Sequence, residues 1–279
     1  MCVSYIGGKS RIGKFIVPFI PKNIENYMEP FGGMYWTFFN MDLKSYPDLK
    51  TIIYNDFNPL NVNVFNCIKN HQDFLEIIKN YPSQNKNLFY KFQNELFDPN
   101  FNFDILKPDY DIASKYIYLL TQVWSGTNVE KGKFIDLKGK YKSKFDTFKD
   151  KLSNKKWQSY FDKINIIENL DFEEFIKKYD DINSYFYLDP PYVLKTIDKT
   201  GGEKYYANHT FTKDDHDRLS KILKNIKGKF SLSYYFFKEL EDWYPKNKYH
   251  WEQKDFAKAS MAKSGMKQTK GTELLIMNY

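Results

Sequence analysis

The tetrapeptide Asp189-Pro190-Pro191-Tyr192 constrains the fold of this chain more than any other stretch. It follows the apolar and aromatic residues 185–188, which predict a buried strand that ends at the aspartate. Because the prolines have no amide hydrogen and a fixed φ, the chain must leave the sheet there. The Pro190 carbonyl and the Asp189 carboxylate are then acceptors beside the flat phenol of Tyr192, a set that suits a planar primary amine. The alternative is a strand ended by prolines, with Asp189 capping the next helix.

The first sixty residues predict a nucleotide-binding α/β unit. A strand leads into the Gly32-Gly33 turn, an apolar helix over residues 34–39 follows, and a second strand at residues 51–54 ends in Asn55-Asp56. An acidic residue about 20 positions beyond such glycines is where these folds hold ribose hydroxyls.

An earlier glycine pair, Gly7-Gly8, stands beside Lys9 and before an amphipathic run at residues 12–20. Backbone amides at a helix start favour an anion such as a phosphate or carboxylate, although a plain turn fits the same pattern.

Composition narrows the remaining classes. The chain has 279 residues, which fits one large domain or one domain with an insertion. Its net charge of +7 and its 19% aromatic residues favour nucleic acid as a partner. A solvated basic surface is the alternative. Two cysteines are too few for a disulfide framework or a zinc site, and neither His209 nor His216 has a ligand partner at metal spacing, so we expect no metal. Without a signal-peptide pattern or a long apolar run, we expect a cytoplasmic protein with no membrane segment.

Residues 61–144 change to a helical pattern, with helices expected at residues 72–80 and 113–123. We predict an inserted recognition domain here, between catalytic segments 1–60 and 145–279. Its end, from residue 124 to 142, alternates lysines with Phe134 and Tyr141, which puts cations on one face for phosphates and leaves rings to replace unstacked bases. A solvated basic hairpin is the alternative.

After this region, residues 163–167 predict a strand, and residues 170–172 its exit into a helix that ends at residue 178. The segment 257–270 carries four lysines and no acidic residue, which predicts a loop that orders on the DNA backbone or a plain flexible hairpin.

Seven stretches together resemble, in the same order, the Dam-type N6-adenine DNA methyltransferases. They are residues 5–9, 29–33, 55–60, 189–192, 209–219, 228–233 and 273–279. The likeness spans nearly the whole chain, and the acidic-Pro-Pro-aromatic tetrapeptide resembles motif IV of the amino-methyltransferases, in the Asp form typical of adenine N6. It implies a Rossmann-like α/β sheet that binds S-adenosylmethionine, a C-terminal hairpin and an inserted helical target-recognition domain.

The resemblance also implies site residues. Those lining the cofactor pocket are Tyr5, Gly8, Lys9, Phe31, Gly33, Asp56, Asp171 and Phe172. The last two would lie against the cofactor's adenine, although Asp171 is equally well placed to cap a helix. Family members usually carry a glycine where this chain has Tyr35. The resemblance therefore does not imply that the backbone at position 35 approaches the cofactor closely.

The expected reaction is direct methyl transfer to an adenine flipped out of double-stranded DNA. The catalytic residues would be Asp189 and Pro190, as acceptors for the two N6 hydrogens, and Tyr192. The expected DNA-binding residues are Asn128, Lys133, Phe134, Lys138, Lys140, Tyr141 and Lys142. Because the family reads bases with asparagine and arginine and this stretch is shorter and lacks arginine, the target sequence does not transfer; lysine can contact guanine and Asn128 can read adenine.

Several alternatives stay open at this point. The acceptor could be cytosine N4, an RNA adenine or a protein glutamine amide, or the chain could be a catalytically inactive DNA-binding relative or a general nucleotide-binding enzyme. The intact Asp56 and Asp189 argue against inactivity. A cognate restriction endonuclease is a further expected partner.

Overall fold

The computed structural model describes residues 12–126, 128–137, 142–192, 211–257 and 270–279. Six of the expected site residues lie outside these ranges. They are Tyr5, Gly8, Lys9, Lys138, Lys140 and Tyr141.

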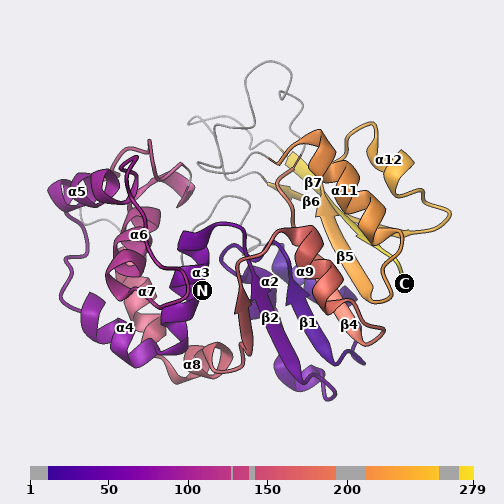
Figure 1. Ribbon diagram of the computed structural model, residues 1–279, viewed down its shortest axis with the longest axis horizontal. Helices are drawn as coiled ribbons and strands as arrows, with labels where there is room; N and C mark the ends of the chain where they lie inside the picture. Colours follow the sequence, from indigo (N-terminus) through magenta and orange to yellow (C-terminus); the bar gives the residue numbers. More distant parts are fainter. Residues whose placement is uncertain (1–11, 127, 138–141, 193–210, 258–269) are drawn as a thin grey trace.

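A seven-stranded, mostly parallel sheet forms the centre of the described structure (Figure 1). Its order is β3-β2-β1-β4-β5-β7-β6, with β1 (Asn26–Glu29), β2 (Thr51–Asn55), β3 (Ile166–Glu168), β4 (Ser184–Leu188), β5 (Lys229–Tyr234), β6 (His250–Ala257) and β7 (Lys270–Met277). The first five strands are parallel, and β7 runs antiparallel to both β5 and β6. The N-terminal end of β7 therefore lies at the same edge as the carboxyl ends of the parallel strands.

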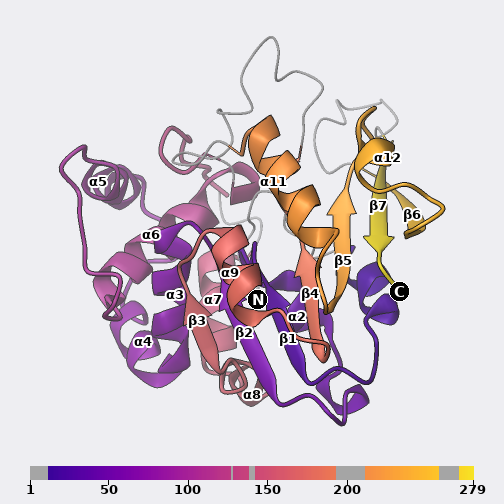
Figure 2. The same cartoon turned by 45° about the vertical axis from the view of Figure 1, so that its right-hand side comes forward.

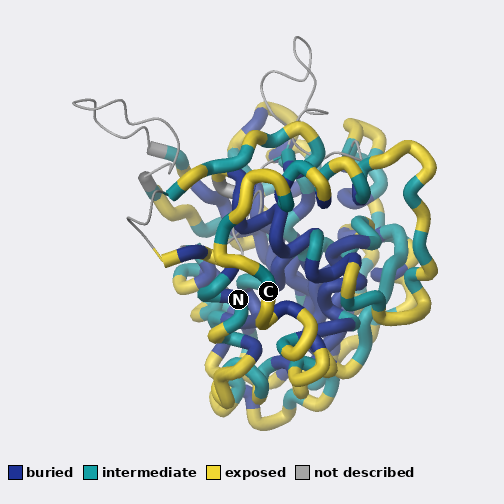
Figure 3. The backbone as a smooth tube through the Cα atoms, turned by 90° about the vertical axis from the view of Figure 1, so that its left-hand side faces the viewer, coloured by how far each residue is buried: buried dark blue, intermediate teal, exposed yellow. Residues whose placement is uncertain are grey.

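Both faces of the sheet are buried, as the unbroken apolar strands predict. Tyr27, Tyr185 and Tyr187 point to one core and the alternating Met28 and Phe186 to the other, because successive strand residues face opposite sides. Figure 3 shows the buried stretches concentrated in the centre of the molecule, with exposed residues along the outer loops.

Helices cover the two faces unequally (Figures 1 and 2). One face packs against α9 (Phe172–Tyr179), α11 (Lys213–Leu223) and α12 (Leu240–Trp243). On the other side lie α1 (Gly13–Ile16), η1 (Val17–Phe19), α2 (Trp36–Asn40), α3 (Pro59–Lys69) and α8 (Lys155–Phe161). Beyond α3, the helices α4 (His71–Ile78), α5 (Lys86–Leu96), α6 (Tyr110–Gln122) and α7 (Lys144–Leu152) pack mainly on α3 and on one another (Figure 1). Short turns η2 (Leu43–Ser45) and η3 (Trp124–Gly126) complete the described elements.

Local sequence signals set where these helices begin. Asn58 caps α3 ahead of Pro59, and Asp109 caps α6 by accepting from the Ile112 amide at 2.9 Å. Thr212 and Asp215 form a reciprocal capping box at the start of α11.

The helical region and the sheet share one hydrophobic core. Buried residues of α3 to α8 belong to the same cluster as Tyr27, Ile52 and Tyr185 of the strands. Helices also continue past residue 144 through α7 and α8, and α3 already begins at Pro59. The architecture is mixed α/β with one continuous core on this face, in which no separate domain is marked off among the described residues. The expected strand at residues 163–167 forms slightly later, as β3.

Tyr35 adopts a conformation that favours glycine. Its φ of 56° and ψ of 38° are left-handed, which costs a residue with a side chain about 1 kcal/mol or more. The fully buried ring packs against Phe38 and Tyr54 at centroid distances of 4.7 and 5.1 Å, and its hydroxyl donates to the Ile53 carbonyl at 3.0 Å. These contacts offset the strain, so the chain keeps the glycine-like turn without the glycine.

His216 makes stability depend on pH. It is 1% exposed, with Nδ1 2.5 Å from the Tyr234 hydroxyl, and burial lowers its pKa to about 4 while nearby Asp215 opposes that shift. Because the unfolded histidine takes up a proton near pH 6.5 and the folded one only near pH 4, stability is full above pH 6.5. It should fall by about 1 to 3 kcal/mol as the pH decreases through this window.

Urea unfolding of the wild type and of His216→Phe between pH 7 and pH 4 measures this contribution, since phenylalanine fits the aromatic surroundings and cannot titrate. We expect the wild type to lose more stability than the variant. Parallel curves would show that His216 is not responsible.

Candidate active site

The sheet has a topological switch point between β1 and β4. From β1 the chain continues to β2 on one side, and from β4 to β5 on the other, so the carboxyl ends of β1 and β4 open a crevice. In open α/β sheets, ligands bind at this position. The segments that leave the two strands here are Glu29-Pro30-Phe31 and Asp189-Pro190, which brings the expected cofactor and acceptor motifs together.

The glycine turn after β1 is tied to the end of β2. Gly33 has a φ of 48°, and its amide donates to Asp56 Oδ2 at 2.6 Å. A Cβ on Gly32 would lie 2.4 Å from the Tyr54 ring, so the close approach there requires glycine. The Asn58 amide donates to Asp56 Oδ1 at 2.8 Å. Burial raises the pKa of Asp56 against the opposing effect of these two hydrogen bonds.

Aromatic rings form a wall around Phe31, which stands two residues before the glycine that binds this carboxylate. Phe31, Phe172 and Phe211 lie with ring centroids 5.5 to 5.6 Å apart. Flat apolar rings beside an anchored carboxylate fit a nucleoside, whose base is planar and whose ribose offers hydroxyl donors. This part of the site therefore fits the adenosine half of S-adenosylmethionine.

Asp171 has the capping role that its position allows. It precedes α9 and accepts from the Glu173 amide at 2.9 Å. Arg218 of α11 also donates to both of its oxygens at 3.1 Å, while its guanidinium lies 4.6 Å from the Phe172 ring centroid. Arg218 thus fixes both members of the predicted acidic-aromatic pair.

The Asp-Pro-Pro-Tyr segment is held by its own phenol. The Tyr192 hydroxyl lies 2.9 Å from Asp189 Oδ1 and 2.7 Å from Oε1 of Glu273 on β7. Desolvation, with both carboxylates nearby, raises the pKa of Tyr192 well above its ordinary value, so the phenol stays neutral. Its ring meets Tyr235 edge-on at a centroid distance of 4.6 Å. Pro190 is buried, and Asp189 is partly exposed at the crevice.

The predicted DNA-binding stretch packs on the helices that precede it. Within residues 128–137 the backbone forms no strand. Gln93 of α5 donates to the carbonyls of Val129 and Gly132 at 2.7 and 3.0 Å, and Gln84 donates to that of Ile135 at 2.8 Å. Two glutamines therefore hold the stretch against the helices.

The side chains of this stretch lie in different surroundings. Phe134 is half-buried and lies against Phe89 at a centroid distance of 5.7 Å, and its role in replacing an unstacked base stays a prediction. Lys133 is exposed, whereas Lys142 is ion-paired with Asp150. Asn128 has a φ of 47° and accepts from the Lys131 amide at 3.1 Å.

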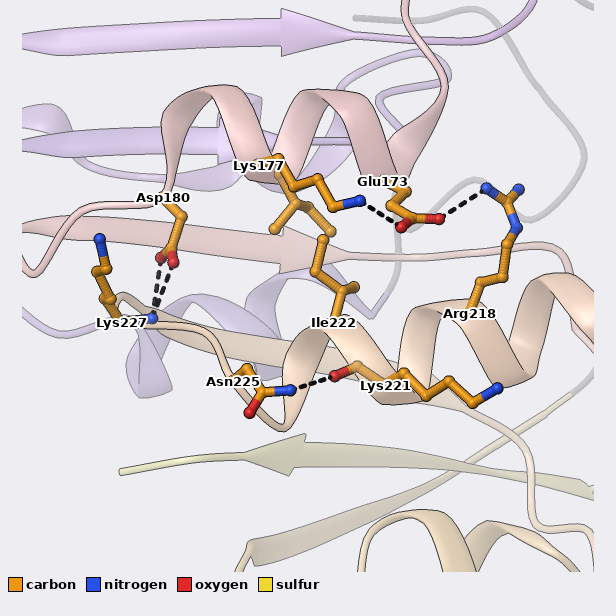
Figure 4. Close-up of a pocket in the computed structure, with 9 residues that line it drawn as sticks. Glu173, Lys177, Asp180, Arg218, Lys221, Ile222, Asn225 and Lys227 are labelled. Carbon is orange, nitrogen blue, oxygen red and sulfur yellow. Dashed lines mark hydrogen bonds and ion pairs between the residues drawn. The ribbon is translucent and has the colours of Figure 1, made fainter.

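A surface groove between α9 and α11 lies outside the crevice (Figure 4). Its charged side chains are largely paired: Lys177 with Glu173, Glu173 with Arg218, and the Lys227 amide with Asp180. The groove reaches the aromatic wall only at Arg218 and Glu173. It therefore lies on the helices that cover the sheet and does not form part of the crevice.

Two features that the described residues lack bear on function. Across the described ranges, no group of three or more His, Cys, Asp or Glu side chains is placed to hold a metal ion. None of the helices in the described part of the chain has the length and apolar character needed to cross a membrane.

Three residues of the site were missed by sequence reasoning. They are Phe211, Arg218 and Glu273. Glu273 belongs to one of the stretches that carry the resemblance, but only the antiparallel course of β7 shows that it reaches the catalytic edge. Arg218 is the sixth residue of α11 and also lies in one of those stretches, but nothing in the sequence indicates that it pairs with Asp171.

In this mostly parallel sheet a glycine turn follows β1, an acidic residue follows β2, and Asp-Pro-Pro-Tyr leaves β4 across the switch point. These features together define an S-adenosylmethionine-dependent amino-methyltransferase. The chain belongs to the D12 class N6 adenine-specific DNA methyltransferase family, whose profile matches residues 5–257. It is thus an enzyme that transfers a methyl group from S-adenosylmethionine to N6 of adenine in DNA.

Two relatives are similar over almost their whole length. The type II methyltransferase M.MjaIII of Methanocaldococcus jannaschii is 28% identical over 301 aligned residues, covering 99% of this chain and 98% of the relative. The type II methyltransferase M.CviBI of Paramecium bursaria Chlorella virus NC1A is 26% identical over 286, with the same shares covered.

Proposed function

We propose that Asp189, the Pro190 carbonyl and Tyr192 form the acceptor site for the adenine amine. The observation that carries this assignment is the exit of Asp-Pro-Pro-Tyr from β4 directly beside the glycine turn of β1, at the switch point. Asp189 and the Pro190 carbonyl accept the two N6 hydrogens, which draws the nitrogen lone pair out of conjugation with the ring. The Tyr192 ring covers one face of the base. Most of the acceleration then comes from positioning the nitrogen.

The cofactor residues follow from the same edge of the sheet. Asp56 holds the ribose hydroxyls, Gly33 lets the backbone approach, and Phe31, Asp171 and Phe172 hold the adenine, supported by Phe211 and Arg218. Tyr5, Gly8 and Lys9 are assigned by resemblance alone. When bound, S-adenosylmethionine supplies an electrophilic methyl group on its sulfonium.

The substrate is double-stranded DNA, in which the target adenine must leave the helix before its amine can reach Asp189. We assign recognition to residues 61–144 as an inserted target-recognition domain. Asn128, Lys133, Lys138, Lys140, Tyr141 and Lys142 are its proposed DNA contacts. Gln84 and Gln93 hold part of this stretch in place.

Salt dependence tests the phosphate contacts. Replacing Lys138, Lys140 and Lys142 with alanine should flatten the plot of log affinity against log salt by about 2 to 3 units, or less if Lys142 stays paired with Asp150. The matched control replaces Lys155, Lys156 and Lys163, which are exposed and lie near the amino end of β3. It removes the same charge and should leave the slope unchanged. Equal slopes in both triple variants would exclude the stretch from the interface.

The type II relatives suggest a wider setting. We propose that the enzyme acts in a restriction-modification system, protecting its target site from a cognate restriction endonuclease in the cytoplasm. Modified and unmodified genomic DNA would then differ in their sensitivity to that nuclease.

Incubation with labelled S-adenosylmethionine and DNA, RNA or protein acceptors tests the function itself. We expect label in duplex DNA, recovered as N6-methyladenine after digestion to nucleosides. Recovery as N4-methylcytosine, or label only in RNA or protein, would overturn the assignment of the acceptor.

A further inference from the structure

Glu273 is a buried acid directed at the catalytic segment. It is 0% exposed, and β7 brings it to the carboxyl edge of the sheet because that strand runs against β5. Its Oε1 lies 2.7 Å from the Tyr192 hydroxyl, which is itself 2.9 Å from Asp189 Oδ1. Two carboxylates from different strands therefore meet at one hydroxyl.

That hydroxyl has a single proton. It can donate fully to only one of the two carboxyl oxygens at a time. Rotation about the phenol C–O bond redirects the proton from Asp189 to Glu273 without any movement of heavy atoms. The two acceptors are thus alternatives for the same hydrogen bond.

The choice between them changes what Asp189 can do. A phenol proton on Asp189 Oδ1 occupies one of its acceptor positions and weakens it as an acceptor for an amine hydrogen. A phenol proton on Glu273 removes this competing donor from Asp189 Oδ1, which can then accept a charge-assisted hydrogen bond from the amine.

We propose that Glu273 is a positioning residue for methyl transfer: it takes the Tyr192 hydrogen bond when the adenine amine binds, and so releases Asp189 to accept the amine hydrogen. The inference rests on the assignment of Asp189 as the amine acceptor. Glu273 itself touches neither substrate nor cofactor in this role.

Single-turnover methylation of Glu273→Leu at saturating cofactor and duplex measures this role. We expect a rate about 10-fold below wild type, because the substitution slows the methyl-transfer step. The dissociation constants for cofactor and duplex should stay within about twofold of wild type, because binding is not affected. Glu273→Gln keeps an amide oxygen as acceptor and should recover much of the rate, to within about threefold of wild type.

The decisive comparison uses Tyr192→Phe, which keeps the ring and removes the proton. In that background Glu273→Leu should lower the rate by less than about twofold, because Asp189 no longer holds a phenol proton. A 10-fold loss that persists in the Tyr192→Phe background, or a wild-type rate for Glu273→Leu alone, would overturn the proposal. If Glu273→Leu does not fold, the same comparison with Glu273→Gln decides.

Two controls separate other causes. Ser233→Ala removes a buried hydrogen bond to Tyr187 on the neighbouring strands, so it should lower the thermal midpoint and leave the rate unchanged. Asp189→Ala tests the underlying assignment: if it keeps the wild-type rate, the acceptor role of Asp189 fails. If Asp189→Ala is inactive but the double-variant comparison gives additive losses, only the role of Glu273 fails.

Discussion

Replacing Asp189 with alanine is expected to lower the single-turnover rate of adenine methylation by 10²-fold or more, while cofactor and DNA affinities stay close to wild type. The hydrogen bond to the amine strengthens as the nitrogen becomes tetrahedral, so its loss belongs to the transition state. Removing one preorganised polar group from an active site typically has an effect of this size.

The structural alternative for Asp189 predicts a different result. If the side chain only closes a turn, its loss should cost about 1 kcal/mol of stability and leave the rate intact. Asp109→Ala is the matched control, because it removes a carboxylate that caps α6 away from the crevice. Thermal midpoint, both affinities and the rate are measured on the two variants. A stable Asp189→Ala enzyme that methylates DNA at the wild-type rate would refute the mechanism.

The second large effect is expected at Asp56. Asp56→Ala should weaken S-adenosylmethionine binding by about 1.5 to 3 kcal/mol, roughly 10- to 150-fold, as for a lost hydrogen bond to a charged acceptor. DNA affinity should hardly change. Asp56→Ala should also be less stable than the wild type, because the amides of Gly33 and Asn58 lose their shared acceptor.

Asn58→Ala separates the two effects of Asp56. It removes the cap of α3, in which Asn58 Oδ1 accepts from the Leu60 amide at 3.0 Å, but keeps the backbone amide that binds Asp56. It should reduce stability by about 1 kcal/mol with normal cofactor affinity. Titration calorimetry that finds wild-type affinity in Asp56→Ala would mean that another residue holds the ribose.

The sequence predicted best where local chemistry decides the structure. Two prolines end β4 whatever packs around it, and a glycine turn followed by Asp56 specifies the start of the α/β unit. The cap formed by Asp171 could also be foreseen, since an aspartate before an amphipathic helix satisfies its free amides.

The sequence says less where the outcome depends on what a side chain packs against. Phe134 alternates with lysines as a surface ring would, yet it packs against Phe89, a neighbour that strand periodicity does not identify. Similarly, helical periodicity in residues 61–144 shows that each helix has an apolar face. It does not show that these faces join the core of the sheet.

Glu273 illustrates the same limit for the site. Its proposed role depends on a reversed strand and on a contact with Tyr192, 81 residues away in sequence. No local pattern around either residue encodes that contact.

The left-handed turn at Tyr35 constrains how this sequence can evolve. Glycine at position 35 would relieve the backbone but leave a void the size of a phenol between Phe38, Tyr54 and Phe65. Truncations that open such voids in cores typically cost about 3 to 5 kcal/mol, well above the strain that is relieved. Position 35 can therefore accept a glycine only if the neighbouring rings enlarge or shift at the same time, so a change there is coupled to changes at Phe38, Tyr54 and Phe65.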